Sequence, residues 1–98
     1  MAAYVIVEAS ITDEAGYEKY KPLAAASIAS HGGRYKARGG ATEPLEGDAA
    51  VGRVVVLEFP DRERAREWYN SDEYKAARRV RQTAASSRIF IVDGYEPG

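Results

Sequence analysis

The sequence predicts a single α+β domain in which four antiparallel strands carry two helices on one face. Three observations lead to this prediction. The chain has 98 residues, which is room for one hydrophobic core. Four short segments rich in β-branched or alternating residues are typical of strands, and two longer segments repeat apolar residues at helical spacing. We therefore expect one domain over residues 1–98, with the order β-α-β-β-α-β.

The first strand and helix are predicted from an apolar run and a capped periodic segment. Residues 3–9 form the apolar, β-branched run. A helix over residues 14–30 follows, with Thr12 or Asp13 as its N-cap. Pro22 lies inside this segment and is expected to kink it or split it in two. The glycines at 32 and 33 are expected to end the helix.

A basic strand and a long loop come next. Residues 34–38 alternate basic and apolar between two glycine pairs, so we expect Arg34, Lys36 and Arg38 to share one face of the sheet. Residues 39–52 contain four glycines and Pro44. A loop of this length in a small domain usually has a function or packs against a partner chain.

The second half of the chain repeats the pattern of strand, helix and strand. Residues 53–59 form the most hydrophobic strand, and Pro60-Asp61 begins the next helix. That helix is predicted over residues 62–69, with a pause at Asn70-Ser71 and a restart to about residue 85. Residues 88–93 form the fourth strand. The whole is the split βαβ, or ferredoxin-like, arrangement.

Alternation along the strands predicts which face each residue occupies. The apolar set assigned to the helix-covered face is Val5, Val7, Tyr35, Ala37, Val55, Leu57, Phe59, Phe90 and Val92. The mixed set assigned to the opposite face is Tyr4, Ile6, Glu8, Arg34, Lys36, Arg38, Val54, Val56, Glu58, Ile89, Ile91 and Asp93. Aliphatic side chains between charges of both signs usually mark an interface. We therefore expect a homodimer packed sheet to sheet.

Composition limits the classes of function. The 14 Lys and Arg nearly balance the 15 Asp and Glu, which argues against binding to nucleic acid or to an anionic membrane surface. Cysteine is absent, so thiol chemistry and cysteine-ligated metal centres are excluded. The N-terminus lacks the pattern of a signal peptide, and no apolar run reaches membrane length. The expected location is the cytoplasm.

Six separated blocks of sequence resemble the bacterial family known as domain of unknown function 1330, in the dimeric α/β-barrel superfamily. They are Gly32-Gly33-Arg34 with Arg38-Gly39-Gly40, Leu45-Glu46-Gly47-Asp48, Glu58-Phe59-Pro60, Trp68-Tyr69-Asn70-Ser71, Glu73-Tyr74, and Arg78 with Arg81. The resemblance implies a homodimer with a central barrel of strands and helices outside. Relatives in that superfamily include cofactor-independent monooxygenases, muconolactone isomerases, stress-response dimers and haem enzymes, so the resemblance implies no single reaction.

The candidate catalytic residues are His31 and Glu58. His31 is the only histidine and has a suitable pKa range for proton transfer, but it has no second histidine for a metal site. The simpler interpretation is a half-buried residue at a helix C-terminus. Glu58 could act as a base or simply pair with arginine. Arg38 could hold an anionic group, whereas Arg34 and Lys36 are expected to pair with carboxylates across the strands.

The candidate ligand-binding residues are mostly aromatic. Around the helix break we expect a pocket walled by Tyr20, Trp68, Tyr69 and Tyr74, with Arg78 and Arg81 near its mouth to orient an acid group. The alternative is that these aromatics only form the core. No dinucleotide fingerprint, phosphate loop or nucleophile elbow is present.

These features predict a small-molecule pocket in each protomer for a small organic acid or aromatic metabolite. If the protein is an enzyme, we expect chemistry without a cofactor or metal, in which His31 or Glu58 handles protons and Arg38 holds an oxyanion. The competing prediction is a non-catalytic binding or stress-response dimer.

Overall fold

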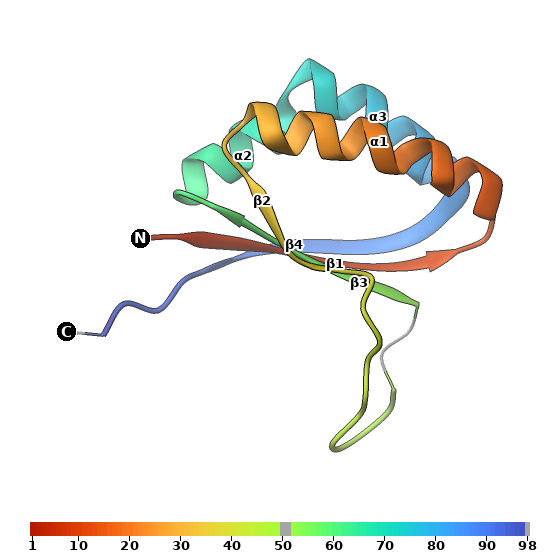
Figure 1. Ribbon diagram of the computed structural model, residues 1–98, viewed down its shortest axis with the longest axis horizontal. Coiled ribbons are helices and arrows are strands. Elements are labelled where there is room, and N and C mark those ends of the chain that lie inside the picture. The colour runs from red at the N-terminus through yellow and green to blue at the C-terminus, as the bar shows by residue number, and fades with distance from the viewer. Residues whose placement is uncertain (50–51, 98) are drawn as a thin grey trace.

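The computed structural model describes residues 1–49 and 52–97. The elements follow in the order β1 (Ala3–Ile11), α1 (Glu14–Ser30), β2 (Arg34–Arg38), β3 (Arg53–Phe59), α2 (Arg62–Asn70), α3 (Asp72–Ala84) and β4 (Ala85–Asp93). Figure 1 shows the three helices in one layer above a four-stranded sheet. The predicted ferredoxin-like α+β fold is confirmed, with the second helix divided in two as the Asn70-Ser71 break predicts.

Side-chain caps explain where the helices begin. Asp13 accepts a hydrogen bond from the backbone N–H of Gly16 at the start of α1. Asp61 and Ser71 cap α2 and α3 in the same way. Pro22 does not split the helix, because α1 is continuous from Glu14 to Ser30 with the proline inside it. Burial of one face of α1 against the core stabilises the helix despite the missing backbone donor.

The strands lie in the order β2-β3-β1-β4, and every neighbouring pair is antiparallel. The two central strands, β1 and β3, pair over seven residues, from Ala3 opposite Phe59 to Ala9 opposite Arg53. The two edge strands are β2 and β4. Strand β4 begins at Ala85, three residues before the predicted start, because its first residues pair with the end of β1.

The predicted faces of β4 are wrong. Val5 of β1 lies opposite Ile91, and Ile6 lies opposite Phe90. Residues directly opposite each other project to the same face of a sheet. Ile89 and Ile91 therefore pack against the core beneath the helices, whereas Phe90 and Val92 project from the other face. The run Ile-Phe-Ile-Val is apolar throughout, so alternation could not determine its orientation.

A bulge in β2 shows that the predicted faces of Ala37 and Arg38 are also wrong. Tyr35 lies opposite Leu57, but the next pair joins Ala37 to Val56, so Lys36 is an extra residue. Beyond the bulge, Ala37 is on the face without helices and Arg38 is on the helix-covered face. The three basic residues of β2 therefore do not share one face, and Arg38 lies on the same side as Tyr35.

The core lies between the helices and the covered face of the sheet. Its largest fully buried side chains are Trp68, Tyr74, Phe59 and Leu57. Aromatic rings pack closely there, with the ring centroids of Trp68 and Tyr74 4.1 Å apart. Burial of such rings supplies much of the favourable free energy of folding in a small domain.

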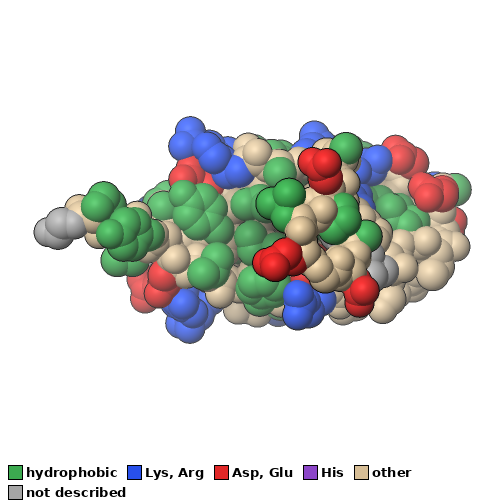
Figure 2. Space-filling model, turned by 90° about the horizontal axis from the view of Figure 1, so that it is seen from below, with side chains coloured by type: hydrophobic (Ala, Val, Ile, Leu, Met, Phe, Trp, Pro, Cys, Tyr) green, Lys and Arg blue, Asp and Glu red, His purple; other side chains and the backbone are tan. Residues whose placement is uncertain are grey.

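The sheet face opposite the helices, which we call the open face, is uncovered. Figure 2 views the molecule from this side and shows hydrophobic side chains between clusters of opposite charge. The apolar side chains there include Tyr4, Ile6, Val54, Val56, Phe90 and Val92. Figure 1 shows the loop between β2 and β3 extending away from the helices, on the side of the open face. Leu45 in this loop is 92% exposed.

Candidate functional site in the cleft between α2 and β4

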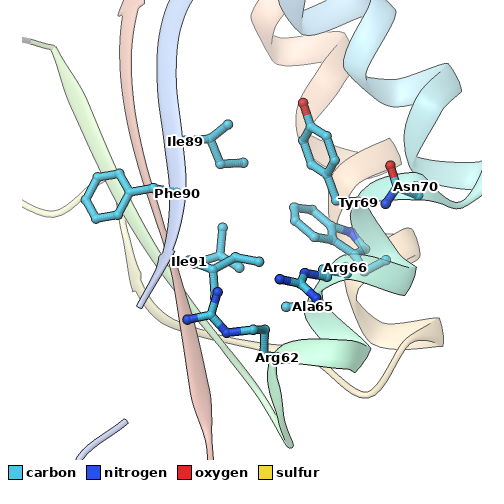
Figure 3. Close-up of a pocket in the computed structure, with 10 residues that line it drawn as sticks. Arg62, Ala65, Arg66, Tyr69, Asn70, Ile89, Phe90 and Ile91 are labelled. Atoms are coloured by element: carbon cyan, nitrogen blue, oxygen red, sulfur yellow. The ribbon is translucent and has the colours of Figure 1, made fainter. Parts of the chain in front are cut away.

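A cleft of about 380 Å³ lies between helix α2 and edge strand β4. We call it the α2–β4 cleft. Figure 3 shows that Ile89 and Ile91 point from β4 toward α2, whereas Phe90 points away. The residues that line the cleft are Val5, Arg62, Ala65, Arg66, Trp68, Tyr69, Asn70, Ile89, Phe90 and Ile91. The volume lies at the lower end of the range for small-molecule sites, about 300 to 1,000 Å³.

Helical and strand periodicity bring these side chains together. Arg62, Arg66 and Asn70 are four residues apart along α2 and so lie on one stripe of the helix. On the other wall, Ile89 and Ile91 alternate along β4 and point to the same face. The cleft consequently has an apolar floor and a polar, cationic wall.

The electrostatics of the cleft depend on two arginines. Nε of Arg62 donates a hydrogen bond of 3.0 Å to Oδ1 of Asp93. This contact lowers the pKa of the Asp93 carboxyl from its usual value, so Asp93 remains ionised and occupies Arg62. Arg66 forms no ion pair within residues 1–49 and 52–97. The cleft thus holds one guanidinium that is available to an anionic group.

Trp68 and Tyr69 are the two predicted ligand-binding residues that line the cleft. Trp68 is 1% exposed, and its ring lies 6.2 Å from that of Tyr69 in an edge-to-face arrangement. Arg78 of α3 does not line the cleft, but its guanidinium lies over the Tyr69 ring at 4.5 Å from the centroid. Arg78 therefore contacts the aromatic wall of the cleft although it does not line the cleft itself.

Tyr20 and Tyr74 lie in the core and do not line this cleft. Their hydroxyl oxygens are 2.8 Å apart, and Nη1 of Arg81 donates to the Tyr74 hydroxyl at 3.1 Å. Burial raises the pKa of both tyrosines, which remain neutral. Arg81 is only 4% exposed, so it does not lie at the mouth of a pocket as expected.

The two predicted catalytic residues lie outside the cleft. Glu58 is on the open face, where Nε of Arg34 donates to it at 2.6 Å and Tyr4 donates to it at 3.2 Å. The hydrogen bond from Arg34 lowers the pKa of the Glu58 carboxyl. His31 is half-buried at the C-cap of α1, with Nδ1 2.8 Å from the carbonyl oxygen of Ser27. Their catalytic roles stay predictions.

Arg38 and Tyr20 line a second, smaller cavity between α1 and strands β2 and β3, which also touches Trp68. Of the predicted site residues, Tyr20 and Arg38 line this cavity, Tyr69 lines the cleft, and Trp68 lines both. His31, Glu58, Tyr74 and Arg78 line neither. Among the described residues, we find no group of three or more His, Asp or Glu side chains placed to hold a metal ion. Nor does the described part of the chain contain a helix long and apolar enough to cross a membrane.

Four residues that line the cleft are not among those predicted from the sequence: Arg62, Arg66, Ile89 and Ile91. The arginines had a recognisable signal, because their spacing of four places them on one helix stripe with Asn70. The isoleucines were assigned to the wrong face. The cleft can hold an apolar group of a ligand against Ile89 and Ile91. It can orient an anionic group of the same ligand with Arg66 and Asn70.

Comparison with known proteins identifies the family and the fold. A family model described as "Domain of unknown function (DUF1330)" matches residues 2–95. No curated protein matches the sequence. The structure is similar to that of methylated RPA0582, a protein from Rhodopseudomonas palustris, with a TM-score of 0.76, 18% identity, and coverage of 99% of this chain and 83% of that one.

Two further structures share the fold. SnoaB, described as a cofactor-independent oxygenase from Streptomyces nogalater, matches with a TM-score of 0.67 and 11% identity, covering 98% of this chain and 95% of that one. Rv0793 from Mycobacterium tuberculosis matches with a TM-score of 0.58 and 14% identity, covering 99% of this chain and 98% of that one. At these identities the likeness concerns the fold.

Proposed function

We propose that this chain, which belongs to the DUF1330 family, is a homodimeric protein that binds a small ligand. The ligand is a partly apolar organic acid, and it binds in the α2–β4 cleft of each protomer. The observation that carries the proposal is that Arg66, beside an apolar floor, forms no ion pair with any described residue. A carboxylate would accept hydrogen bonds from the guanidinium fork, while the organic group of the ligand would cover Ile89 and Ile91.

The aromatic wall favours a flat or aromatic ligand body. Trp68 is almost fully buried and is fixed by its neighbours, and Tyr69 is held by the Arg78 guanidinium. Rigid aromatic side chains lose little conformational entropy when a ligand binds. Asn70, at the end of α2, supplies an amide that can donate to or accept from a second polar group of the ligand.

The homodimer is proposed from the open face. Phe90 and Val92 are 41% and 46% exposed there, beside the aliphatic side chains of β1 and β3. A contiguous apolar surface rimmed by charges is typical of an interface. The loop between β2 and β3 extends on this same side, where it would contact a second protomer. Because β4 is an edge strand, the partner would also lie close to the cleft.

A second candidate function is cofactor-independent oxygenation of such a ligand. The likeness in fold to SnoaB favours it. This chemistry needs an activated substrate, and His31, Glu58 and Arg38 are the residues predicted to handle protons and to hold an oxyanion. Oxygen consumption in the presence of a bound ligand would separate this function from binding alone, which is the property expected of a non-catalytic or stress-response dimer.

Trp68 provides the test of the binding site, because it is the only tryptophan of the chain and lines the cleft. We would titrate the protein with benzoate and phenylacetate, with benzyl alcohol as a neutral probe, and follow the fluorescence of Trp68. The acids should bind, and Arg66→Gln should weaken them about ten- to a hundredfold, because a charge-assisted hydrogen bond is lost. Arg79→Gln, an exposed substitution on α3, is the matched control.

The proposal is contradicted if benzyl alcohol binds as well as benzoate, or if Arg66→Gln and Arg79→Gln bind the acids equally well. Native mass spectrometry of the purified protein adds a second measurement. A dimer that retains extra mass per protomer would support the pocket, and the mass would identify the class of ligand. A monomer would contradict the homodimer.

A further inference from the structure

The second cavity, between α1, β2 and β3, has an unusual lining. It has a volume of about 20 Å³, enough for about one water-sized group. Its polar lining consists of three tyrosines and three cations, Tyr17, Tyr20, Tyr35, Lys21, Arg38 and Arg53. Among the described residues, no carboxylate lines it. We call it the cation cavity.

Arg53 lines this cavity, and one nitrogen of its guanidinium has no hydrogen-bond partner. Its guanidinium lies 5.8 Å from the centroid of the Tyr17 ring, and its Nε is buried without a hydrogen-bond partner. A buried donor left unpaired costs free energy, so native proteins rarely keep one. Gly39 makes the position possible, because a side chain there would overlap the Arg53 guanidinium, and the backbone φ of +69° is one that glycine tolerates.

Arg38 reaches the same cavity because of the bulge in β2. Its guanidinium lies over the Tyr35 ring at 4.4 Å from the centroid. Neither Arg38 nor Arg53 forms an ion pair with any described residue. Arginines elsewhere on the sheet behave differently, since Arg34 is paired with Glu58 and Arg88 with Glu8.

One carboxylate approaches from α1, but it is already used. Glu18 lies 2.7 Å from Nζ of Lys21, and it is this contact that chiefly lowers the pKa of Glu18, with a smaller effect from Arg53. The cavity therefore has three cations and one neighbouring carboxylate. Arg38 and Arg53 line the same cavity, so an anion placed there would be attracted by both guanidinium groups.

We propose that Arg38 and Arg53 together bind a small oxyanion, a carboxylate or phosphate group, at the mouth of the cation cavity. One oxygen of the anion lies at the mouth of the cavity and accepts from the Arg53 guanidinium. The remaining oxygens face Arg38, whose guanidinium supplies further donors in a planar fork. The site is separate from the α2–β4 cleft and does not depend on the function proposed for that cleft, although Trp68 forms part of both walls.

The test uses sodium phosphate and sodium acetate as probes, each against sodium chloride at equal ionic strength. The protein as purified is melted at each of several probe concentrations. In a separate titration at 25 °C, the fluorescence of Trp68 is followed. We expect the change in Trp68 fluorescence to reach a plateau, and the melting temperature to rise by about 6 to 11 °C at ten times the dissociation constant. A larger effect of phosphate or of acetate tells whether the natural group is a phosphate or a carboxylate.

Variants assign the effect to the two arginines. Arg38→Gln should abolish the rise in melting temperature, and so should Arg53→Gln. Arg53→Lys, which keeps the charge without the fork, provides a second variant if Arg53→Gln fails to fold, and it should weaken binding at least about tenfold. Arg79→Gln, an exposed substitution on α3, should keep the full rise.

The proposal is overturned if neither probe raises the melting temperature above its value in sodium chloride. It is equally overturned if Arg38→Gln and Arg79→Gln respond alike to phosphate and acetate, since the effect would then be a general response to salt.

Discussion

Ser27 and Trp68, 41 residues apart in the chain, are joined by a buried hydrogen bond of 3.0 Å from the indole N–H to Oγ. Ser27 is 0% exposed and donates its own hydroxyl hydrogen to the carbonyl oxygen of Ala24 at 2.8 Å. The serine therefore satisfies the only polar atom of the Trp68 side chain. This bond connects α1 to α2 and fixes the ring that forms a wall of both cavities.

Substitution of Ser27 by alanine should destabilise the protein. It leaves the buried indole N–H without an acceptor, and the expected loss in the free energy of unfolding is about 1 to 3 kcal/mol. Urea denaturation followed by circular dichroism would measure it. Ser87→Ala, at an exposed position of β4, is the control and should change stability by less than about 0.5 kcal/mol. Equal effects of the two substitutions would show that the bond contributes nothing.

The network of Tyr20, Tyr74 and Arg81 predicts an asymmetry between two substitutions. Tyr74→Phe removes the acceptor of a buried guanidinium, whose Nε is already unpartnered. A cost of about 3 kcal/mol is expected, as for other buried charges left without a partner. Arg81→Met should cost less, because Tyr74 keeps its contact with Tyr20 and a desolvated charge is replaced by an apolar chain. Thermal and urea unfolding of both variants would test the order, and a larger loss in Arg81→Met would contradict it.

The fold could be predicted from the sequence because its signals are local. Caps, glycine pairs and the break at Asn70-Ser71 act within a few residues, and they placed most elements correctly. The site was harder to predict, since it depends on which face each residue occupies. In β4 the apolar run carried no alternation, and in β2 one extra residue moved Arg38 to the helix-covered face.

Burial of polar residues was the other part that the sequence did not reveal. Arg81 belongs to a run of arginines on α3, which is the usual pattern of a solvated face, yet it lies between α1 and α3 with the hydroxyl of Tyr74. Ser27 is surrounded in sequence by small residues and gives no sign of its role. The partner of Ser27 is 41 residues away, so this contact follows only from the packed fold. Tyr74 and Arg81 are seven residues apart on α3 and so share a helix face, but only the packed fold shows that this face is buried.

The Arg34–Glu58 pair predicts a loss of stability in acid. Arg34 lowers the pKa of Glu58 below its usual value of 4.5. Because the pKa is lower in the folded protein, this contribution is complete above the unfolded value and is lost as pH falls through the folded value. The free energy of unfolding, measured with urea between pH 7 and pH 3, should therefore decrease once the pH is below about 4.5.

Glu58→Gln should make that fall less steep, and Arg34→Gln should do the same, since either change removes the same pair. The measurement is the slope of unfolding free energy against pH in the three proteins. If both variants keep the slope of the parent protein, Glu58 does not contribute to the acid sensitivity and the pair is not formed in solution.

The proposed dimer predicts that Phe90→Lys should dissociate the protein. In an interface with twofold symmetry each substitution is present twice, so its effect on the association free energy is doubled. Loss of one buried Phe contact costs about 2 kcal/mol, and two copies correspond to about a thousandfold weaker association.

Leu23→Lys is the matched control, because Leu23 is 46% exposed on α1, in the helix layer away from the open face. Sedimentation over a range of concentrations should show a dimer for the parent protein and Leu23→Lys, and a monomer for Phe90→Lys. A dimer of unchanged affinity in Phe90→Lys would place the interface elsewhere, because a lysine buried against an apolar sheet could not be accommodated without that cost.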